Sequence, residues 1–164
     1  MTDRRWQIDW DSTRDVFRRG FRSSLHCAMA SVGPDGAPHV TPIGSVLLTE
    51  PGRGIFFDMF TSDLSYNLDN DPRVCVMAVD SGRRFWLTAL TRGRFSKAPA
   101  VRLSGTAGPR REATPQEQAR FLRRVRPASR LRGHQLLWSN LAMVRDLEFE
   151  DAEPVNLGAM TQQV

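Results

Sequence analysis

The side chains that most often carry catalysis are scattered along this sequence. Its three histidines, His26, His39 and His134, lie far apart, and no short motif brings them together. The sequence has no GxGxxG motif after a strand, no P-loop, no HExxH motif and no serine in a nucleophile elbow. We therefore expect neither hydrolytic chemistry nor a metal site, and we assign no side chain a catalytic role.

The two cysteines, Cys27 and Cys75, do not form a pattern typical of metal ligands or of a disulfide framework. Each lies in an apolar run that is typical of a strand. We predict two buried free thiols, since a free cysteine behaves as a small hydrophobic residue. A disulfide or a reactive thiol is the alternative.

Hydroxyl groups gather at the start of one predicted helix, over Ser62–Asn70. Thr61 or Ser62 can cap this helix, Asp63 suits its first turn, and Asp71-Pro72 ends it. A helix start offers unpaired N–H groups and the positive end of the helix dipole, and both suit a phosphate. The alternative is that Thr61 and Ser62 are ordinary caps with no ligand.

The elements around this helix are predicted to be strands joined by tight turns. Gly33-Pro34-Asp35-Gly36 and Glu50-Pro51-Gly52-Arg53-Gly54 are strong turn signals, because proline presets φ and glycine accepts positive φ. The succession of short strands and turns indicates an antiparallel barrel or sandwich. Strands are expected over Leu25–Val32, Ala37–Leu48, Ile55–Phe60, Arg73–Val79, Val101–Ala107 and Met143–Glu150.

The clearest helix signal is the capping box Thr114-Pro115-Gln116-Glu117, with proline at the first helical position. Its expected apolar stripe is Ala119, Leu122 and Val125, with Phe121 beside it. Further short helices are expected over Ser12–Arg22 and Ser129–Asn140. The segment Arg83–Pro99 fits a short strand and a helical turn equally well.

Length and composition are those of one folded domain: the chain has 164 residues, of which 40% are hydrophobic. No apolar run approaches the ~20 residues of a membrane span, and no secretory signal is visible, so we expect a soluble cytoplasmic protein. The net charge is +5, and eight arginines lie within Arg110–Arg132. This strip suits phosphates or an acidic surface, or it is a solvated helix face. Its single aromatic residue is Phe121, and one ring is too few for a base-stacking surface, which disfavours nucleic acid.

Four segments in succession give the chain a recognisable pattern. Gly36–Gly44 (GAPHVTPIG) is followed by Ile55–Val74 (IFFDMFTSDLSYNLDNDPRV), and Val101–Gly105 (VRLSG) and Leu136–Phe149 (LLWSNLAMVRDLEF) come later. In order and spacing, these segments resemble the pyridoxamine-phosphate-oxidase-like family of FMN-binding split barrels. The resemblance covers most of the chain from Leu25 to Glu150. It implies a mainly β fold, an antiparallel split β-barrel with peripheral helices.

The resemblance also implies where a cofactor would lie. A strand like His39–Gly44 lies along the flavin ring in this family, and the start of the following helix holds the cofactor phosphate. The implied cofactor-binding residues are Val40, Thr41, Pro42, Ile43, Asp58, Thr61, Ser62 and Arg102.

The resemblance implies a biochemical role as well. It points to FMN, to a homodimer with the cofactor between subunits, and to an oxidoreductase acting on an unidentified small molecule. The flavin would carry the redox chemistry, which would explain the missing catalytic constellation. Phe85 and Trp86 would suit the subunit interface, and Trp138 is expected to pack in the core or at that interface.

The sequence departs from the family pattern where the phosphate would bind. Family members commonly carry a basic pair after the serine, where this chain has Asp63 and Leu64. True pyridoxamine-phosphate oxidases have glutamine where this chain has Ala100, so we do not expect that activity. One alternative is a deazaflavin-dependent reductase, in which Arg110–Arg132 would meet the acidic tail of the deazaflavin cofactor. The other is a non-catalytic flavin carrier, haem carrier or cofactor-free barrel. A haem carrier would need His26, His39 or His134 as its axial ligand.

Overall fold

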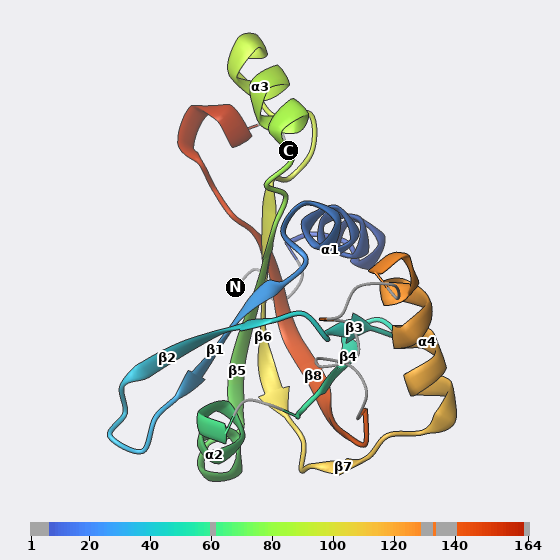
Figure 1. Cartoon of the computed structure of the whole chain (residues 1–164). Coiled ribbons are helices and arrows are strands. Elements are labelled where there is room, and N and C mark those ends of the chain that lie inside the picture. Colours follow the sequence, from blue (N-terminus) through green and yellow to red (C-terminus); the bar gives the residue numbers. More distant parts are fainter. Residues whose placement is uncertain (1–6, 60–61, 129–132, 134–140, 163–164) are drawn as a thin grey trace.

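A curled antiparallel sheet forms the centre of the computed structural model, which describes residues 7–59, 62–128, 133 and 141–162 (Figure 1). The strand order is β2-β1-β5-β6-β8-β4-β3, and β7 pairs with β8. This architecture confirms the predicted mainly β split barrel. The strands are β1 (Cys27–Val32), β2 (Pro38–Ile43), β3 (Leu47–Leu48), β4 (Arg53–Phe57), β5 (Arg73–Val79), β6 (Ala100–Ala107), β7 (Arg111–Glu112) and β8 (Met143–Pro154).

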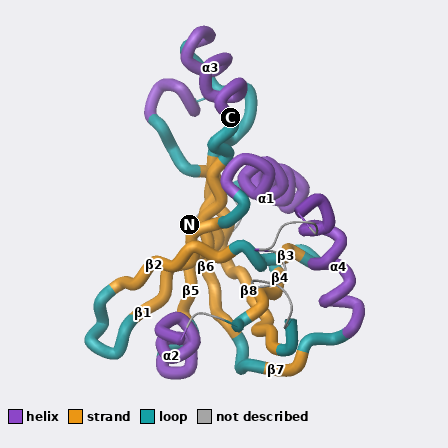
Figure 2. The backbone as a smooth tube through the Cα atoms, in the orientation of Figure 1, coloured by secondary structure: helices purple, strands orange, loops and turns teal. Residues whose placement is uncertain are grey.

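Helices lie around the periphery of this sheet (Figure 2). Helix α2 (Ser62–Asn70) has the bounds that the sequence predicts. The capping box of Thr114 and Glu117 is present at the start of α4 (Pro115–Val125). Asp9 caps α1 by accepting a hydrogen bond from the Ser12 N–H. The helices are α1 (Trp10–Ser24), α2 (Ser62–Asn70), α3 (Arg83–Arg92) and α4 (Pro115–Val125), with 3-10 turns at Arg126–Ala128 and Gly158–Thr161.

The core has two parts. The larger part lies between one face of the sheet and helices α1 and α2, and it includes Met29, Val76 and Leu64. The smaller part lies under α4, where Phe121 packs on Phe57 with ring centroids 5.1 Å apart. The predicted apolar stripe on α4 was therefore wrong. Phe121, expected beside the stripe, is fully buried, whereas Ala119 and Leu122, expected within it, are exposed.

The long strand predicted over Ala37–Leu48 is divided into β2 and β3. Ser45 lies at the break, and its hydroxyl donates to the Phe57 carbonyl and accepts from the Phe57 N–H. These bonds draw the chain away from β1 and towards β4. The side chain of Arg124 also holds the carbonyls of Gly44 and Val46, so the break is fixed from two sides.

The segment whose structure the sequence left open forms helix α3, which ends at Gly93 in the left-handed conformation. Figure 1 shows α3 standing beyond the end of the barrel, near the C-terminal segment. Phe85 and Trp86, which were expected at a subunit interface, are half-buried and contact Phe95 within the chain.

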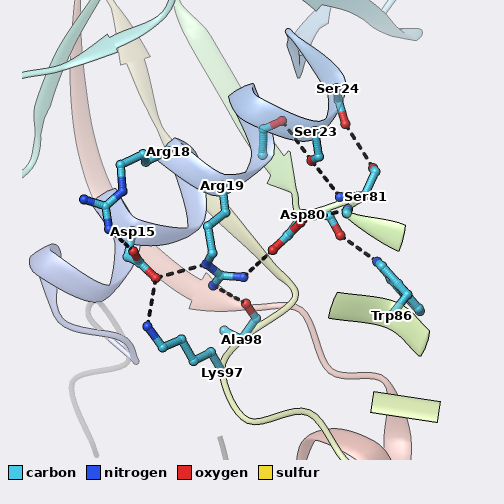
Figure 3. Close-up of polar contacts among 12 residues, drawn as sticks. Asp15, Arg18, Arg19, Ser23, Ser24, Asp80, Ser81, Trp86, Lys97 and Ala98 are labelled. Carbon is cyan, nitrogen blue, oxygen red and sulfur yellow. Dashed lines mark hydrogen bonds and ion pairs between the residues drawn. The ribbon is translucent and has the colours of Figure 1, made fainter. Parts of the chain in front are cut away.

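Arg19 fastens α1 to the turn that precedes α3 (Figure 3). Its guanidinium binds Asp80 at 2.7 Å, Asp15 at 3.0 Å and the carbonyl of Ala98 at 2.9 Å. Asp80 is buried and also caps the Gly82 N–H. One arginine therefore joins three segments that are distant in sequence.

Two further expectations concern a helix near the C-terminal strand and membrane-spanning segments. The helix predicted over Ser129–Asn140, with Trp138, lies almost entirely outside them. Within the described part of the chain, no helix is long and apolar enough to cross a membrane.

Candidate functional site

The residues predicted to lie along a flavin divide between the two faces of β2. Thr41 and Ile43 pair with Met29 and Cys27 of β1, which are core residues, so these two side chains turn inward. Val40 and Pro42 turn to the outer face, where Val40 is 67% exposed. Only Val40 and Pro42 of this group therefore present side chains to a ligand on that face.

Arg102 lies on the same outer face as Pro42. Strand pairing joins Pro42 to Ala28, Ala28 to Met77, and Met77 to Arg102 in one row across β2, β1, β5 and β6. Three strand spacings of about 4.8 Å separate Pro42 from Arg102 by about 14 Å. The row ends at Glu153 of β8, whose carboxylate pairs with Arg102 at 2.7 Å.

A second row on this face ends in a carboxylate with one unpartnered oxygen among the described residues. It runs from Val40 through Ala30, Cys75 and Ser104 to Asp151. The Oδ1 atom of Asp151 is buried and has no hydrogen-bond partner among the described residues. Burial, with a smaller contribution from nearby Glu153, raises the pKa of Asp151. A buried acceptor without a donor indicates that something outside this chain's described residues supplies one.

The backbone of β2 adds a further polar group. Gly33 donates to the Ala37 carbonyl, so the antiparallel alternation turns the backbone groups of residues 38, 40 and 42 away from β1. Pro38 and Pro42 have no N–H. Val40 thus offers the outward N–H donor within this strand, and β2 is at an edge of the sheet.

Asp58, another predicted cofactor residue, is committed to a buried ion pair. Arg145 Nε lies 2.6 Å from Asp58 Oδ2, and the Ser65 hydroxyl donates to the other carboxylate oxygen. Arg145 also binds Asp69 at 2.7 Å. Burial disfavours the charged guanidinium, but its hydrogen bonds to Asp58 and Asp69 outweigh this and raise the pKa of Arg145. The pair ties β4 and β8 to α2, so Asp58 positions the start of that helix.

The start of α2 carries more negative than positive charge. Ser62 is exposed, with its hydroxyl 3.4 Å from the Asp63 carboxylate, and Thr61 lies outside the described residues. Leu64 is 1% exposed and packs in the core. A basic side chain at this position would therefore be buried and would not reach a phosphate at the surface. Arg110 brings a cation to this region by donating to the Asp58 carbonyl at 3.1 Å.

Sequence reasoning assigned no site role to Arg145 or Asp151, and it noted Arg110 only as the first residue of the arginine strip Arg110–Arg132. Arg145 was detectable in principle, because it shares the strand parity of Met143, Leu147 and Phe149 and so lies on the apolar face of β8. Asp151 becomes notable only through burial, which no sequence pattern marks.

The histidines offer little to a metal. His26 and His39 are exposed, and His134 lies outside the described residues. Among the residues that the structure describes, no group of three or more histidine, cysteine or acidic side chains has a geometry that would hold a metal ion.

The fold and the outer sheet face define this chain as a split-barrel protein. A family model described as pyridoxamine 5'-phosphate oxidase matches residues 13–147, so the chain belongs to this family. A comparison with curated proteins gives no match.

Solved structures share the fold at low sequence identity. HupZ of Group A Streptococcus has a TM-score of 0.60 at 14% identity, covering 93% of this chain and 98% of HupZ. An FMN-binding protein of Syntrophomonas wolfei has a TM-score of 0.61 at 12% identity, covering 92% and 90%. HutZ, the haem storage protein of Vibrio cholerae, has a TM-score of 0.53 at 14% identity, covering 87% and 94%.

Proposed function

We propose that this protein is an FMN-dependent oxidoreductase that holds its cofactor on the outer face of β1, β2, β5 and β6. The observation that carries the proposal is the buried Oδ1 of Asp151, which has no partner among the described residues and lies in one row with the exposed Val40. A flavin has both an apolar ring and polar N–H and O–H donors, which suits an apolar face ending in a free acceptor. Family membership and the FMN-binding protein of Syntrophomonas wolfei support the same choice.

The residues present fit the ring better than the phosphate. Val40, Pro42, Ala28 and Met77 would lie against the ring, with the Val40 N–H as a donor to its polar edge. Arg110, which reaches from the β6–β7 connection to the Asp58 carbonyl, would meet the phosphate together with Ser62. When bound, FMN would supply hydride transfer, and the side chains of this chain would hold and orient it.

We also propose that a second copy of this chain covers the outer face. An exposed valine beside half-buried Ala28, Ala30 and Met77 forms an apolar surface of the kind that subunit interfaces bury. A face-to-face homodimer would enclose the cofactor between subunits. The substrate is then a small molecule that reaches the flavin at the edge of this interface.

The test is a visible absorption spectrum after incubation with excess FMN and desalting. We expect about one flavin per chain, reduced flavin retention in Asp151→Ala, and unchanged retention in Glu150→Ala, a neighbouring acid that is exposed and has no partner in the β6–β8 register. Asp63→Lys is expected to raise FMN affinity, whereas Asp11→Lys, the same charge change on α1, is expected to leave it unchanged. A protein that retains no FMN in any variant would contradict the proposal.

A second candidate, a split barrel that binds no FMN, is favoured by the charge at the start of α2. Asp63 is exposed there, and Arg145 is already neutralised by two carboxylates. Retention of a deazaflavin or of haem in place of FMN would identify a carrier or reductase of that kind. A deazaflavin tail would have to reach α4, which lies across the molecule from the tip of the β1–β2 hairpin (Figure 1).

A further inference from the structure

A cavity lies away from the outer sheet face, between α1, α4 and the link from β2 to β3. Its volume is about 530 Å³, within the range of about 300–1,000 Å³ typical of small-molecule sites. Phe17, Val46 and Leu47 form buried apolar walls. In Figure 1, α1 lies above the β3–β4 hairpin and α4 lies to the right of it.

The polar lining of this cavity is entirely basic. Arg14, Arg18 and Arg22 follow one another at intervals of four residues along α1, and Arg124 approaches from α4. The described lining residues include no carboxylate. Arg18 is paired with Asp15, but neither Arg14 nor Arg22 has an ion-pair partner among the described residues. The cavity is therefore apolar inside and positive at its border.

Arg124 is a largely desolvated cation with no ion-pair partner among the described residues. Its guanidinium donates to the carbonyls of Val46 and Gly44 and lies 4.3 Å from the centroid of the Phe21 ring. Burial lowers the pKa of Arg124 to about 10, so the group stays charged at neutral pH. Two carbonyls use two of its five N–H donors. A buried charge that no carboxylate offsets is costly, and an anion in the cavity would offset it.

Leu25 gives a second, independent indication of a ligand. It follows α1 at φ +64°, a left-handed conformation that glycine normally occupies at a helix C-terminus. Its side chain is 78% exposed and lines the cavity. The left-handed turn lets the Leu25 N–H close the end of α1 on the Phe21 carbonyl, but this bond needs no apolar side chain in water. Backbone strain of this kind is often found where a ligand is held.

We propose that this cavity binds an amphipathic monocarboxylate, a molecule with an apolar hydrocarbon chain and one terminal carboxylate. The chain would lie against Phe17, Val46 and Leu47, and Leu25 would cover it. The carboxylate would meet Arg124 and Arg22. This site is separate from the proposed flavin site, so either one can be present without the other.

The test is isothermal titration of the full-length protein with octanoate, octan-1-ol and acetate. Octanoate has both the chain and the charge, octan-1-ol has the chain alone, and acetate has the charge alone. We expect octanoate to bind once per chain and at least about tenfold more tightly than either of the others. Equal affinity for octanoate and octan-1-ol would overturn the proposal, as would the absence of octanoate binding.

Two arginine variants and a matched control separate the site from general charge. Arg124→Met and Arg22→Met are expected to weaken octanoate binding by about tenfold while leaving octan-1-ol unchanged. Arg123→Met removes an exposed arginine of α4 that does not line the cavity, and it should bind octanoate as the wild type does. The Arg22 side chain makes no hydrogen bond or ion pair with described residues. Its variant therefore tests the carboxylate site even if Arg124→Met fails to fold. Equal weakening in Arg123→Met would contradict a specific site.

Leu25→Gly tests the strained residue directly. Glycine accepts positive φ without cost, and little packing is lost because the leucine is exposed. We expect the melting temperature to rise by about 2–4 °C. Octanoate binding should weaken at the same time. A rise in stability with no change in octanoate affinity would remove Leu25 from the site and overturn its proposed role as a cover.

Discussion

Arg145 of β8 and Asp58, which follows β4, form an ion pair in which each side chain is only 1% exposed, with 2.6 Å between Nε and Oδ2. The remaining guanidinium donors reach Asp69 and the carbonyls of Gly108 and Ser65. A buried pair contributes little net stability when complete, but removal of one partner leaves an isolated charge in the core. This ion pair fixes the start of α2, which a cofactor phosphate would approach in the proposed function.

Arg145→Met is expected to destabilise the protein by about 3–5 kcal/mol, because Asp58 is then buried and unpaired. The double variant Asp58→Asn/Arg145→Met should recover part of this loss. Urea unfolding of the four proteins in the cycle measures both effects. The exposed pair of Arg53 and Glu148 serves as the control, and Arg53→Met should shift the unfolding midpoint little. Equal losses in the two arginine variants would refute a special role for Arg145.

The capping box of α4 is expected to give a pH-dependent contribution to stability. Hydrogen bonds from Arg111 and then from Thr114 outweigh partial burial and lower the pKa of Glu117 from 4.5 to about 2. Because the folded-state pKa is depressed, the contribution is complete above the unfolded value and is lost as the pH falls towards 2.

Glu117→Gln should therefore be less stable than the wild type by about 1 kcal/mol at pH 7. The difference should disappear at pH 2. Urea midpoints measured at several pH values test this, with Glu112→Gln as a control at an exposed position in β7. A difference that is constant across the pH range would show that the charge of Glu117 plays no part.

The two thiols are expected to differ in reactivity. Burial raises the pKa of Cys27 to about 12 and also raises the pKa of the half-buried Cys75. A thiol reagent at pH 8 should label Cys75 slowly in the folded protein and Cys27 only after unfolding. The Cys75→Ser variant identifies the slow site, and rapid labelling of that variant under native conditions would disprove the assignment.

Gly105 lies at a β-bulge where the β6–β8 register shifts after Ser104. A Cβ atom at Gly105 would lie 1.9 Å from the carbonyl oxygen of Glu148, so the backbone would have to move. We expect Gly105→Ala to destabilise the protein by about 2 kcal/mol or more. Gly108→Ala is the control, because its new Cβ would be 3.7 Å from the nearest atom. Equal unfolding midpoints for the two variants would argue against close packing at the bulge.

Local signals predicted those elements whose boundaries are set by neighbouring residues. Helix α2 and strand β5 begin and end where proline, aspartate and alternating valines indicate, and the capping box places α4. Strand β2 ends early for a reason that local pattern cannot show, since Ser45 and Arg124 act across the fold. Helix α3 was ambiguous because its aromatic residues pack on Phe95 through tertiary contacts.

The candidate site was predicted only in outline. Resemblance indicated the strand and helix on which the candidate site is built, but strand parity decides that Val40 and Pro42 face outward while Thr41 and Ile43 face the core. The unpaired oxygen of Asp151 depends on burial by several strands. Likewise, the burial of Leu64 shows that a cation introduced there would disrupt the core before it met a phosphate, so Asp63 is the better position for that test.

The two prolines of β2 limit how molecules of this protein can associate. Pro38 and Pro42 leave Val40 as the one outward N–H donor of that edge, and the opposite edge strand, β3, has only two residues. Neither edge offers the continuous row of hydrogen-bonding groups on which a further strand would add. The sheet is thereby protected against open-ended, edge-to-edge aggregation. Two copies that associate through their strands must stack their faces, and such an assembly is closed after one pairing.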